Sequence, residues 1–181
     1  MKEFKLIPFG DAKTDLSLNG SVRLQDGKIF IEYRIENSAQ IIGMKKLNEG
    51  KIHGAQADEL WKNTCFEAFW SFSEKPSDPY WEFNLAPDGR WNVYTFHEYR
   101  KRNPHWKPDF KPEVSIMKDG EKTLLHVSFP FGNATPSLKL YFGLSAVIEN
   151  KDGKLSYWAL THAGSEPDFH DKRSFTLVLN P

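Results

Sequence analysis

The sequence predicts an all-β protein, a two-sheet antiparallel β-sandwich of the jelly-roll or immunoglobulin-like kind with about ten strands. Turn signals recur along the chain between segments rich in β-branched and aromatic residues, which predicts β-hairpins. A type I′ turn needs positive φ at both central residues, and Asn or Asp followed by Gly tolerates this best. The pairs are Asn19-Gly20, Asp26-Gly27, Asp88-Gly89, Asp119-Gly120 and Asp152-Gly153.

The expected strands follow these turns at short spacing. In chain order they are Phe4 to Phe9, Ser21 to Gln25, Lys28 to Glu36, Thr64 to Ser73, Tyr80 to Ala86, Trp91 to Glu98, Glu113 to Lys118, Thr123 to Phe129, Lys139 to Glu149, Leu155 to Leu160 and Ser174 to Leu179. One short helix is expected at Ala55 to Lys62. Three connections are long for a compact domain, Asn37 to Asn63, Tyr99 to Pro112 and Thr161 to Arg173. Long ordered loops often carry function.

Length and composition restrict the class of protein. A chain of 181 residues predicts one domain over residues 1–181. A domain of this size buries roughly 70% of its unfolded surface, so it needs no metal or disulfide to fold. The 24 basic and 24 acidic residues balance, which argues against nucleic acid as a main partner. Cys65 is the one cysteine, so no intrachain disulfide forms.

The chain also carries no targeting or membrane signal. Its first residues are too short and too broken an apolar stretch for a signal peptide. No run of about 18 apolar residues occurs, so no membrane partner is expected. We therefore expect a cytoplasmic protein, whose oligomeric state the sequence leaves open.

Alternation along two central strands separates an apolar face from a polar one. Phe66, Ala68, Trp70 and Phe72 lie on one face of the first strand, and Trp81, Phe83 and Leu85 on one face of the second. Glu67, Glu82 and Asn84 then share the opposite face. That face is either the ordinary solvent side of an antiparallel sheet or a shallow site. Carboxylates and amides beside aromatic rings suit sugars, because polar groups bond hydroxyls while rings stack on C–H faces.

Several segments, in this order, resemble a known bacterial family. They are Asp58 to Phe69, Tyr80 to Trp91, Tyr99-Arg100, Tyr157 to His162 and Pro167 to His170. Together they resemble the DOMON-like family, which is grouped with DOMON domains and with carbohydrate-binding module family 9. The resemblance extends from Asp58 to Leu179.

The resemblance implies a β-sandwich that binds a sugar or haem. In the carbohydrate-binding modules, tryptophans hold the sugar beside polar groups, and the candidates here are Trp61, Trp81, Trp91 and Trp158. Haem-binding DOMON domains use an axial Met and His. Met44 and Met117 lie in no ligation motif, so we expect no haem and no other cofactor.

Other candidate sites have plainer interpretations. His162, Asp168 and His170 share a loop but match no metal-binding pattern, so we expect no metal and a hydrogen-bonded loop that shapes the site. The basic, aromatic segment Tyr99 to Pro108 could bind single-stranded nucleic acid or clamp an anionic sugar through Arg100. In a neutral chain we expect a solvated loop. Cys65 is expected to be a small buried side chain.

These observations predict a non-catalytic domain that binds a small-molecule or oligosaccharide ligand on one sheet face. The expected site residues are Trp61, Glu67, Glu82, Asn84, Arg100, Trp158 and His162. A haem-binding domain is one alternative. A glycoside hydrolase is another, with Glu67 and Glu82 as its two carboxyl groups, about 5 Å apart for retention or about 6.5–9.5 Å for inversion.

Overall fold

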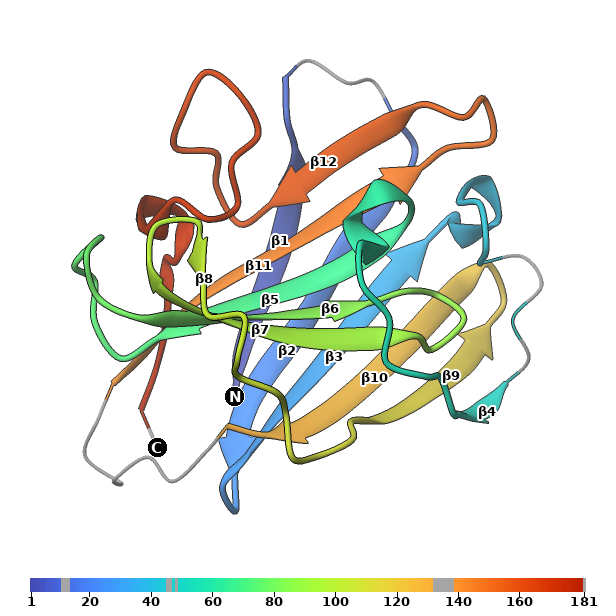
Figure 1. Ribbon diagram of the computed structural model, residues 1–181. Coiled ribbons are helices and arrows are strands. Elements are labelled where there is room, and N and C mark those ends of the chain that lie inside the picture. Colours follow the sequence, from blue (N-terminus) through green and yellow to red (C-terminus); the bar gives the residue numbers. More distant parts are fainter. Residues whose placement is uncertain (11–13, 45–46, 48, 132–138, 181) are drawn as a thin grey trace.

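The computed structural model describes residues 1–10, 14–44, 47, 49–131 and 139–180 (Figure 1). Strands dominate these residues and helices are short. The strands are β1 (Lys2–Pro8), β2 (Ser17–Gln25), β3 (Lys28–Glu36), β4 (Gly50–Ile52), β5 (Cys65–Ser71), β6 (Tyr80–Leu85), β7 (Trp91–Glu98), β8 (Lys101–Arg102), β9 (Glu113–Asp119), β10 (Lys122–Pro130), β11 (Leu140–Glu149), β12 (Leu155–Ala159) and β13 (Leu177–Leu179). Three 3-10 helices are η1 (Ser38–Gln40), η2 (Leu60–Lys62) and η3 (Lys172–Ser174). The all-β prediction is confirmed.

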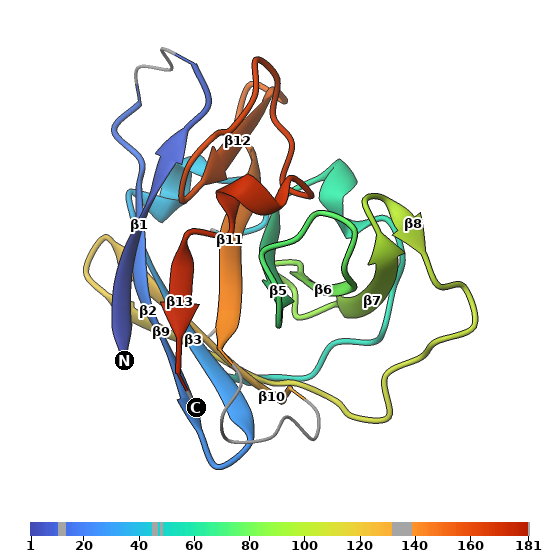
Figure 2. The same cartoon turned by 90° about the vertical axis from the view of Figure 1, so that its left-hand side faces the viewer.

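All the strands belong to one curled antiparallel sheet, ordered β4-β9-β10-β3-β2-β1-β12-β11-β5-β6-β7-β8, with β13 beside β11. The sequence predicts two separate sheets. This is wrong, because β1 pairs with strands of both halves of the single curled sheet. Its residues Lys2 to Leu6 pair with β2, whereas Ile7 and Pro8 pair with β12. The prediction of about ten strands missed the short ones, and the described residues hold 13. Figure 2 shows the two halves of the sheet facing each other.

The core lies between the two halves. The inward side chains of β2, β3, β9 and β10 meet those of β5, β6, β7 and β11 in one cluster. Phe83 stacks on Phe129 with ring centroids 4.5 Å apart, and the Tyr33 hydroxyl donates a 3.0 Å hydrogen bond to the Glu67 carbonyl oxygen. These contacts confirm that the apolar face of β5 and β6 is the core face. The opposite face of these strands is therefore available for a site.

The turns follow the Asp-Gly pairs. Asp26 and Gly27 both take positive φ, 50° and 70°, as a type I′ hairpin requires. In the other three Asp-Gly turns only the glycine has positive φ, at Gly89, Gly120 and Gly153.

Asn19-Gly20 is not a turn, although the sequence predicts one. It lies inside β2, which begins at Ser17 rather than at Ser21. A Cβ at position 20 would collide with the Glu32 carbonyl oxygen and with the Phe4 ring. The glycine therefore allows the backbone of β3 and the Phe4 ring to pack closely against β2.

A helix is expected at 55–62, but the structure contains only the single turn η2 there. Gln56 forms a parallel bridge with Trp91, and the Ala57 N–H donates to the Trp91 carbonyl oxygen. These backbone bonds hold the segment extended, and Glu59 then takes a left-handed φ of 60°. Of the first long connection, residues 45, 46 and 48 lie outside the described residues. Within the described residues, no helix is long and apolar enough to cross a membrane.

Candidate functional site

A cavity of about 460 Å³ lies over the face of β5, β6 and β7 that points away from the core. Glu67 of β5 and Glu82 of β6 line it, together with Tyr94 and Phe96 of β7. Loops bring Arg100, Phe169 and His170 to its walls, Arg102 comes from the short strand β8, and Trp61 of η2 also lines the cavity. The alternation of the strands and three separate loops therefore build this cavity together.

The strand register places the polar groups in neighbouring positions. Glu67 pairs with Asn84, and Asn84 pairs with Asn92 on β7. Two residues along, Glu82 pairs with Tyr94. The shared face of Glu67, Glu82 and Asn84 is the one that alternation predicts, but it is not an open solvent face. Glu67 is 3% exposed and Glu82 is 4% exposed.

Burial changes the ionisation of both carboxyl groups. It raises the pKa of Glu67 well above the usual range, and the charge of Glu82 raises it further. Burial also raises the pKa of Glu82, to about 7, although a hydrogen bond from Asn84 and the charges of Arg100 and Arg102 lower it. The Asn84 amide nitrogen donates to Glu82 Oε1 over 2.8 Å.

His170 is neutral, and its hydrogen-bond partner sets its tautomer. The Tyr80 hydroxyl accepts the Arg100 backbone N–H at 3.0 Å and lies 2.8 Å from His170 Nδ1. Because the hydroxyl oxygen already accepts this N–H, we assign its hydrogen to Nδ1, which places the ring proton on Nε2. Burial lowers the pKa of His170 to about 4, and the positive charge of Arg100 lowers it as well. The cavity therefore receives a neutral imidazole with its N–H facing inward.

A hydrogen-bonded group fixes Arg100. Its Nη2 donates to Asp168 Oδ1 at 2.9 Å and its Nε to the Tyr99 hydroxyl at 3.2 Å. Tyr99 donates in turn to Asp168 Oδ2 at 2.6 Å. Although burial raises the pKa of Asp168, these bonds hold it below its usual value. Arg100 thus presents to the cavity a guanidinium group whose position is fixed by hydrogen bonds.

Aromatic rings form another part of the cavity wall. The Trp61 ring lies 5.8 Å from that of Tyr94 in an edge-to-face arrangement. The Arg102 guanidinium carbon is 4.1 Å from the centroid of the Tyr94 ring. The Tyr94 hydroxyl donates to Asp58 Oδ1 at 3.0 Å. At 38% exposure, Trp61 keeps part of its surface free at the rim.

The structure brings together most, but not all, of the residues expected at the site. Trp61, Glu67, Glu82 and Arg100 line the cavity, and Asn84 is fully buried against Glu82.

Trp158 and His162 lie elsewhere. Trp158 is 3% exposed in the core and donates to Ser156 Oγ at 3.0 Å, whereas His162 Nε2 lies 3.0 Å from the Ile7 carbonyl oxygen and its ring contacts Phe9. Of the other tryptophan candidates, Trp81 stacks on Trp70, and Trp91 is 5% exposed in the core.

Sequence reasoning left several cavity residues out of the expected site. Tyr94 and Phe96 are two residues apart on β7, so alternation along that strand places them on one face and could have indicated both. Arg102, Tyr157 and Phe169 come from β8, β12 and a loop. No local pattern marks these three, because the folded chain alone brings them to the cavity.

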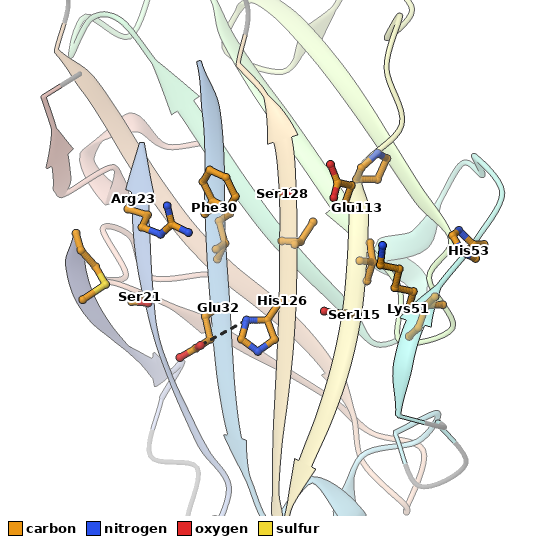
Figure 3. Close-up of a pocket in the computed structure, with 16 residues that line it drawn as sticks. Ser21, Arg23, Phe30, Glu32, Lys51, His53, Glu113, Ser115, His126 and Ser128 are labelled. Carbon is orange, nitrogen blue, oxygen red and sulfur yellow. Dashed lines mark ion pairs between the residues drawn. The ribbon is translucent and has the colours of Figure 1, made fainter. Parts of the chain in front are cut away.

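A second cavity of about 460 Å³ lies on the outer face of the other half of the sheet (Figure 3). Its charged side chains lie at the surface and contact neighbouring groups there. Glu32 Oε2 is 3.4 Å from His126 Nδ1, and the Arg23 guanidinium carbon is 4.0 Å from the centroid of the Phe30 ring. It contains no buried carboxyl group among the described residues, so the cavity over β5, β6 and β7 is the better candidate.

Neither methionine considered for haem lines the cavity. Met44 is 1% exposed in the core, and Met117 is 55% exposed on β9. Across the residues with described positions, no three His, Cys, Asp or Glu side chains gather in a way that could hold a metal ion.

The chain matches no protein-family model and no curated protein sequence. Solved structures do resemble it. One is a carbohydrate-binding module of family 9 from Caldicellulosiruptor kristjanssonii in complex with cellotriose, with a TM-score of 0.61 and 4% identity, covering 94% of this chain and 77% of that one. A second structure of a family 9 module from the same organism, in complex with glucose, has a TM-score of 0.57 and 4% identity, covering 94% of this chain and 78% of that one.

A third similar structure is a Bacteroides uniformis protein to which carbohydrate binding is ascribed. Its TM-score is 0.57 at 12% identity, covering 97% of this chain and 85% of that one. At these identities the likeness establishes the fold alone. It agrees with the expected family 9 grouping at that level, whereas membership of the DOMON-like family stays a prediction.

Proposed function

We propose that this chain binds carbohydrate in the cavity over β5, β6 and β7 and does not hydrolyse it. The observation that carries the proposal is the pair of buried carboxyl groups, Glu67 and Glu82, set among aromatic rings and held guanidinium groups. Clefts with a few convergent polar groups on an apolar lining are the usual form of a small-molecule site.

Each group has a chemical role toward a sugar. The ring of Trp61, exposed at the rim, offers a flat apolar surface to C–H groups. Glu82 accepts hydrogen bonds from hydroxyl groups, and the His170 Nε2–H and the arginines donate to hydroxyl oxygens. Few contacts of this kind leave about 4–8 kcal/mol after ordering costs, so we expect dissociation constants from micromolar to millimolar.

The similar structures suggest probes for the first experiment. Two of them contain cellotriose and glucose, and their fold supports a carbohydrate-binding role here. Calorimetry should therefore begin with these two sugars and extend to a glycan array. A Glu82→Gln variant should bind the best sugar at least about tenfold more weakly, because hydrogen bonds to charged groups contribute about 1.5–3 kcal/mol. Glu113→Gln, an exposed carboxylate on β9, is the matched control and should bind normally.

A glycoside hydrolase is the second candidate function. Its support is the pKa of Glu82, raised by burial to about 7, because a general acid works best with a pKa near the working pH. Chromogenic glycosides distinguish the two functions. Turnover that Glu82→Gln abolishes, with sugar binding intact, would establish the hydrolase and refute the binding domain.

A further inference from the structure

Lys172, the first residue of η3, is a buried cation whose hydrogen-bond partners are all uncharged. It is 8% exposed. Its ammonium donates to the carbonyl oxygens of Lys75 and Asp78, each at 2.8 Å, to Ser71 Oγ at 3.0 Å and to the Ser73 carbonyl oxygen at 3.3 Å. The side chain has thus exchanged water for four oxygens, one at the end of β5 and three in the loop that follows it, which share its three N–H donors.

This environment differs from that of an ordinary buried lysine. Buried charges are costly unless they are paired and hydrogen-bonded. Within the described ranges Lys172 forms no ion pair, and burial lowers its pKa while the charge of Asp78 raises it. Backbone carbonyl and hydroxyl oxygens are instead the ligands with which proteins replace the hydration shell of a small cation. We call the four oxygens from Ser71, Ser73, Lys75 and Asp78 the oxygen cage.

Ser71 of the oxygen cage is also held by hydrogen bonds that do not involve the lysine. The Ser71 hydroxyl donates its hydrogen to the Pro79 carbonyl oxygen at 2.8 Å, which leaves its lone pairs for the ammonium. The same oxygen accepts the Ser73 N–H at 3.2 Å, so it also shapes the loop between β5 and β6.

Lys172 connects this loop to the wall of the candidate site. Asp168 and His170 precede it by four and two residues, and both contribute to the cavity wall or to its support. The ammonium also lies 5.7 Å from the centroid of the Tyr80 ring, and the Tyr80 hydroxyl holds His170 Nδ1. One cation therefore contacts both the chain segment and the tyrosine that orient His170.

We propose that the oxygen cage is an internal cation site which the Lys172 ammonium fills, and that this cation is a positioning device for His170 and Asp168. The proposal goes beyond sugar binding. Its tests need no sugar, so they succeed or fail independently of the proposed function.

The first test uses the unaltered protein. The ammonium protons of exposed lysines exchange with water too fast to observe by nitrogen-15 NMR near neutral pH, whereas a caged ammonium is protected. We expect one protected lysine ammonium signal, absent in Lys172→Met. If no protected ammonium signal appears in the unaltered protein, the cage does not hold the ammonium and the proposal is wrong.

The second test reads the position of His170. Lys172→Met keeps an unbranched side chain as far as the ε position but removes the ammonium group and its donors. The ring nitrogen signals of His170 should then lose the Nε2–H pattern, and amides of residues 71–79 and 168–175 should exchange faster. Lys154→Met, at an exposed lysine, is the matched control. Unchanged His170 signals in Lys172→Met would overturn the positioning role.

The third test refills the oxygen cage. Lys172→Ala should lower Tm by roughly 5 °C or more, because buried acceptors lose their partners. Ammonium or methylammonium chloride should restore part of that loss by binding to the folded state. Tetramethylammonium chloride at equal ionic strength has no N–H donors and should not. Equal effects of all three salts on Tm would show that the cage binds no cation.

Discussion

Nε2 of His170 lies 3.8 Å from Oε2 of Glu82. This distance is too long for a direct hydrogen bond, and Tyr80 already holds the other ring nitrogen. The cavity therefore presents an N–H donor and a carboxyl acceptor side by side, neither of them used by the other. A hydroxyl group both donates and accepts, so it can bridge the two atoms. This pairing favours a hydroxyl-rich ligand over an apolar one.

Trp61→Ala should weaken sugar binding more than it weakens the fold. Trp61 is 38% exposed at the rim, so its removal leaves no buried cavity. We expect affinity to fall about tenfold, the loss of roughly 1.4 kcal/mol, with Tm nearly unchanged. Calorimetry and thermal unfolding measure the two effects. Met117→Ala removes another exposed apolar side chain on the far half of the sheet and should alter neither.

Trp158→Ala should have the opposite pattern. Trp158 is 3% exposed in the core, and truncating a buried tryptophan typically costs about 3–5 kcal/mol. Denaturant unfolding should show this loss, while the fraction that remains folded binds sugar with normal affinity. A loss of affinity without a loss of stability would place Trp158 in the site after all.

The free energy of unfolding should depend on pH through Glu82. Its folded pKa is raised to about 7 by burial, above the unfolded value of about 4.3. Its contribution to stability is thus fully present below the unfolded pKa and is lost as pH rises through the folded pKa. As pH rises between these two pKa values, the free energy of unfolding of Glu82→Gln should increase relative to that of the unaltered protein, by up to about 1.4 kcal/mol per pH unit. Urea unfolding across this pH window measures the difference.

His170 gives the opposite sign and serves as the control for that experiment. Its folded pKa is lowered by burial to about 4, below the unfolded value of about 6.5. Its contribution is therefore present above the unfolded pKa and is lost as pH falls toward the folded one. His170→Gln should accordingly lose stability relative to the unaltered protein as pH rises through the window. Parallel pH curves for both variants would contradict the burial of these groups.

Gly20→Ala should destabilise the fold although it lies in a strand, where alanine is normally tolerated. A Cβ there meets the Glu32 carbonyl oxygen and the Phe4 ring. Overpacking of this kind costs about 1–3 kcal/mol, which chemical unfolding can detect. Gly164→Ala, where the nearest heavy atom lies 3.7 Å from the added Cβ, should change stability much less. A neutral Gly20→Ala would indicate that both the Glu32 carbonyl group and the Phe4 ring can move aside.

The pattern of the strands and the face of the site could be predicted from the sequence. β7 has the expected bounds, Trp91–Glu98, and Glu67, Glu82 and Asn84 lie on the expected face. Both results follow from local rules, because side chains alternate along any strand and Asp-Gly pairs favour hairpin turns. Asn19-Gly20 satisfied the same rule but lies within β2, and the requirement for glycine there comes from the Glu32 carbonyl oxygen and the Phe4 ring, which neighbouring strands bring close.

The sequence by itself determined that the chain forms β-hairpins and which side of β5 and β6 carries polar groups. Tertiary structure alone decided that β1 joins both halves of the sheet, that Trp158 lies in the core, and that Arg102 and Phe169 reach the cavity. It also decided that Glu67 and Glu82 are buried and that the Lys172 ammonium lies in an oxygen cage. Burial and pKa depend on atoms that distant segments bring together, and no spacing along the chain specifies those contacts.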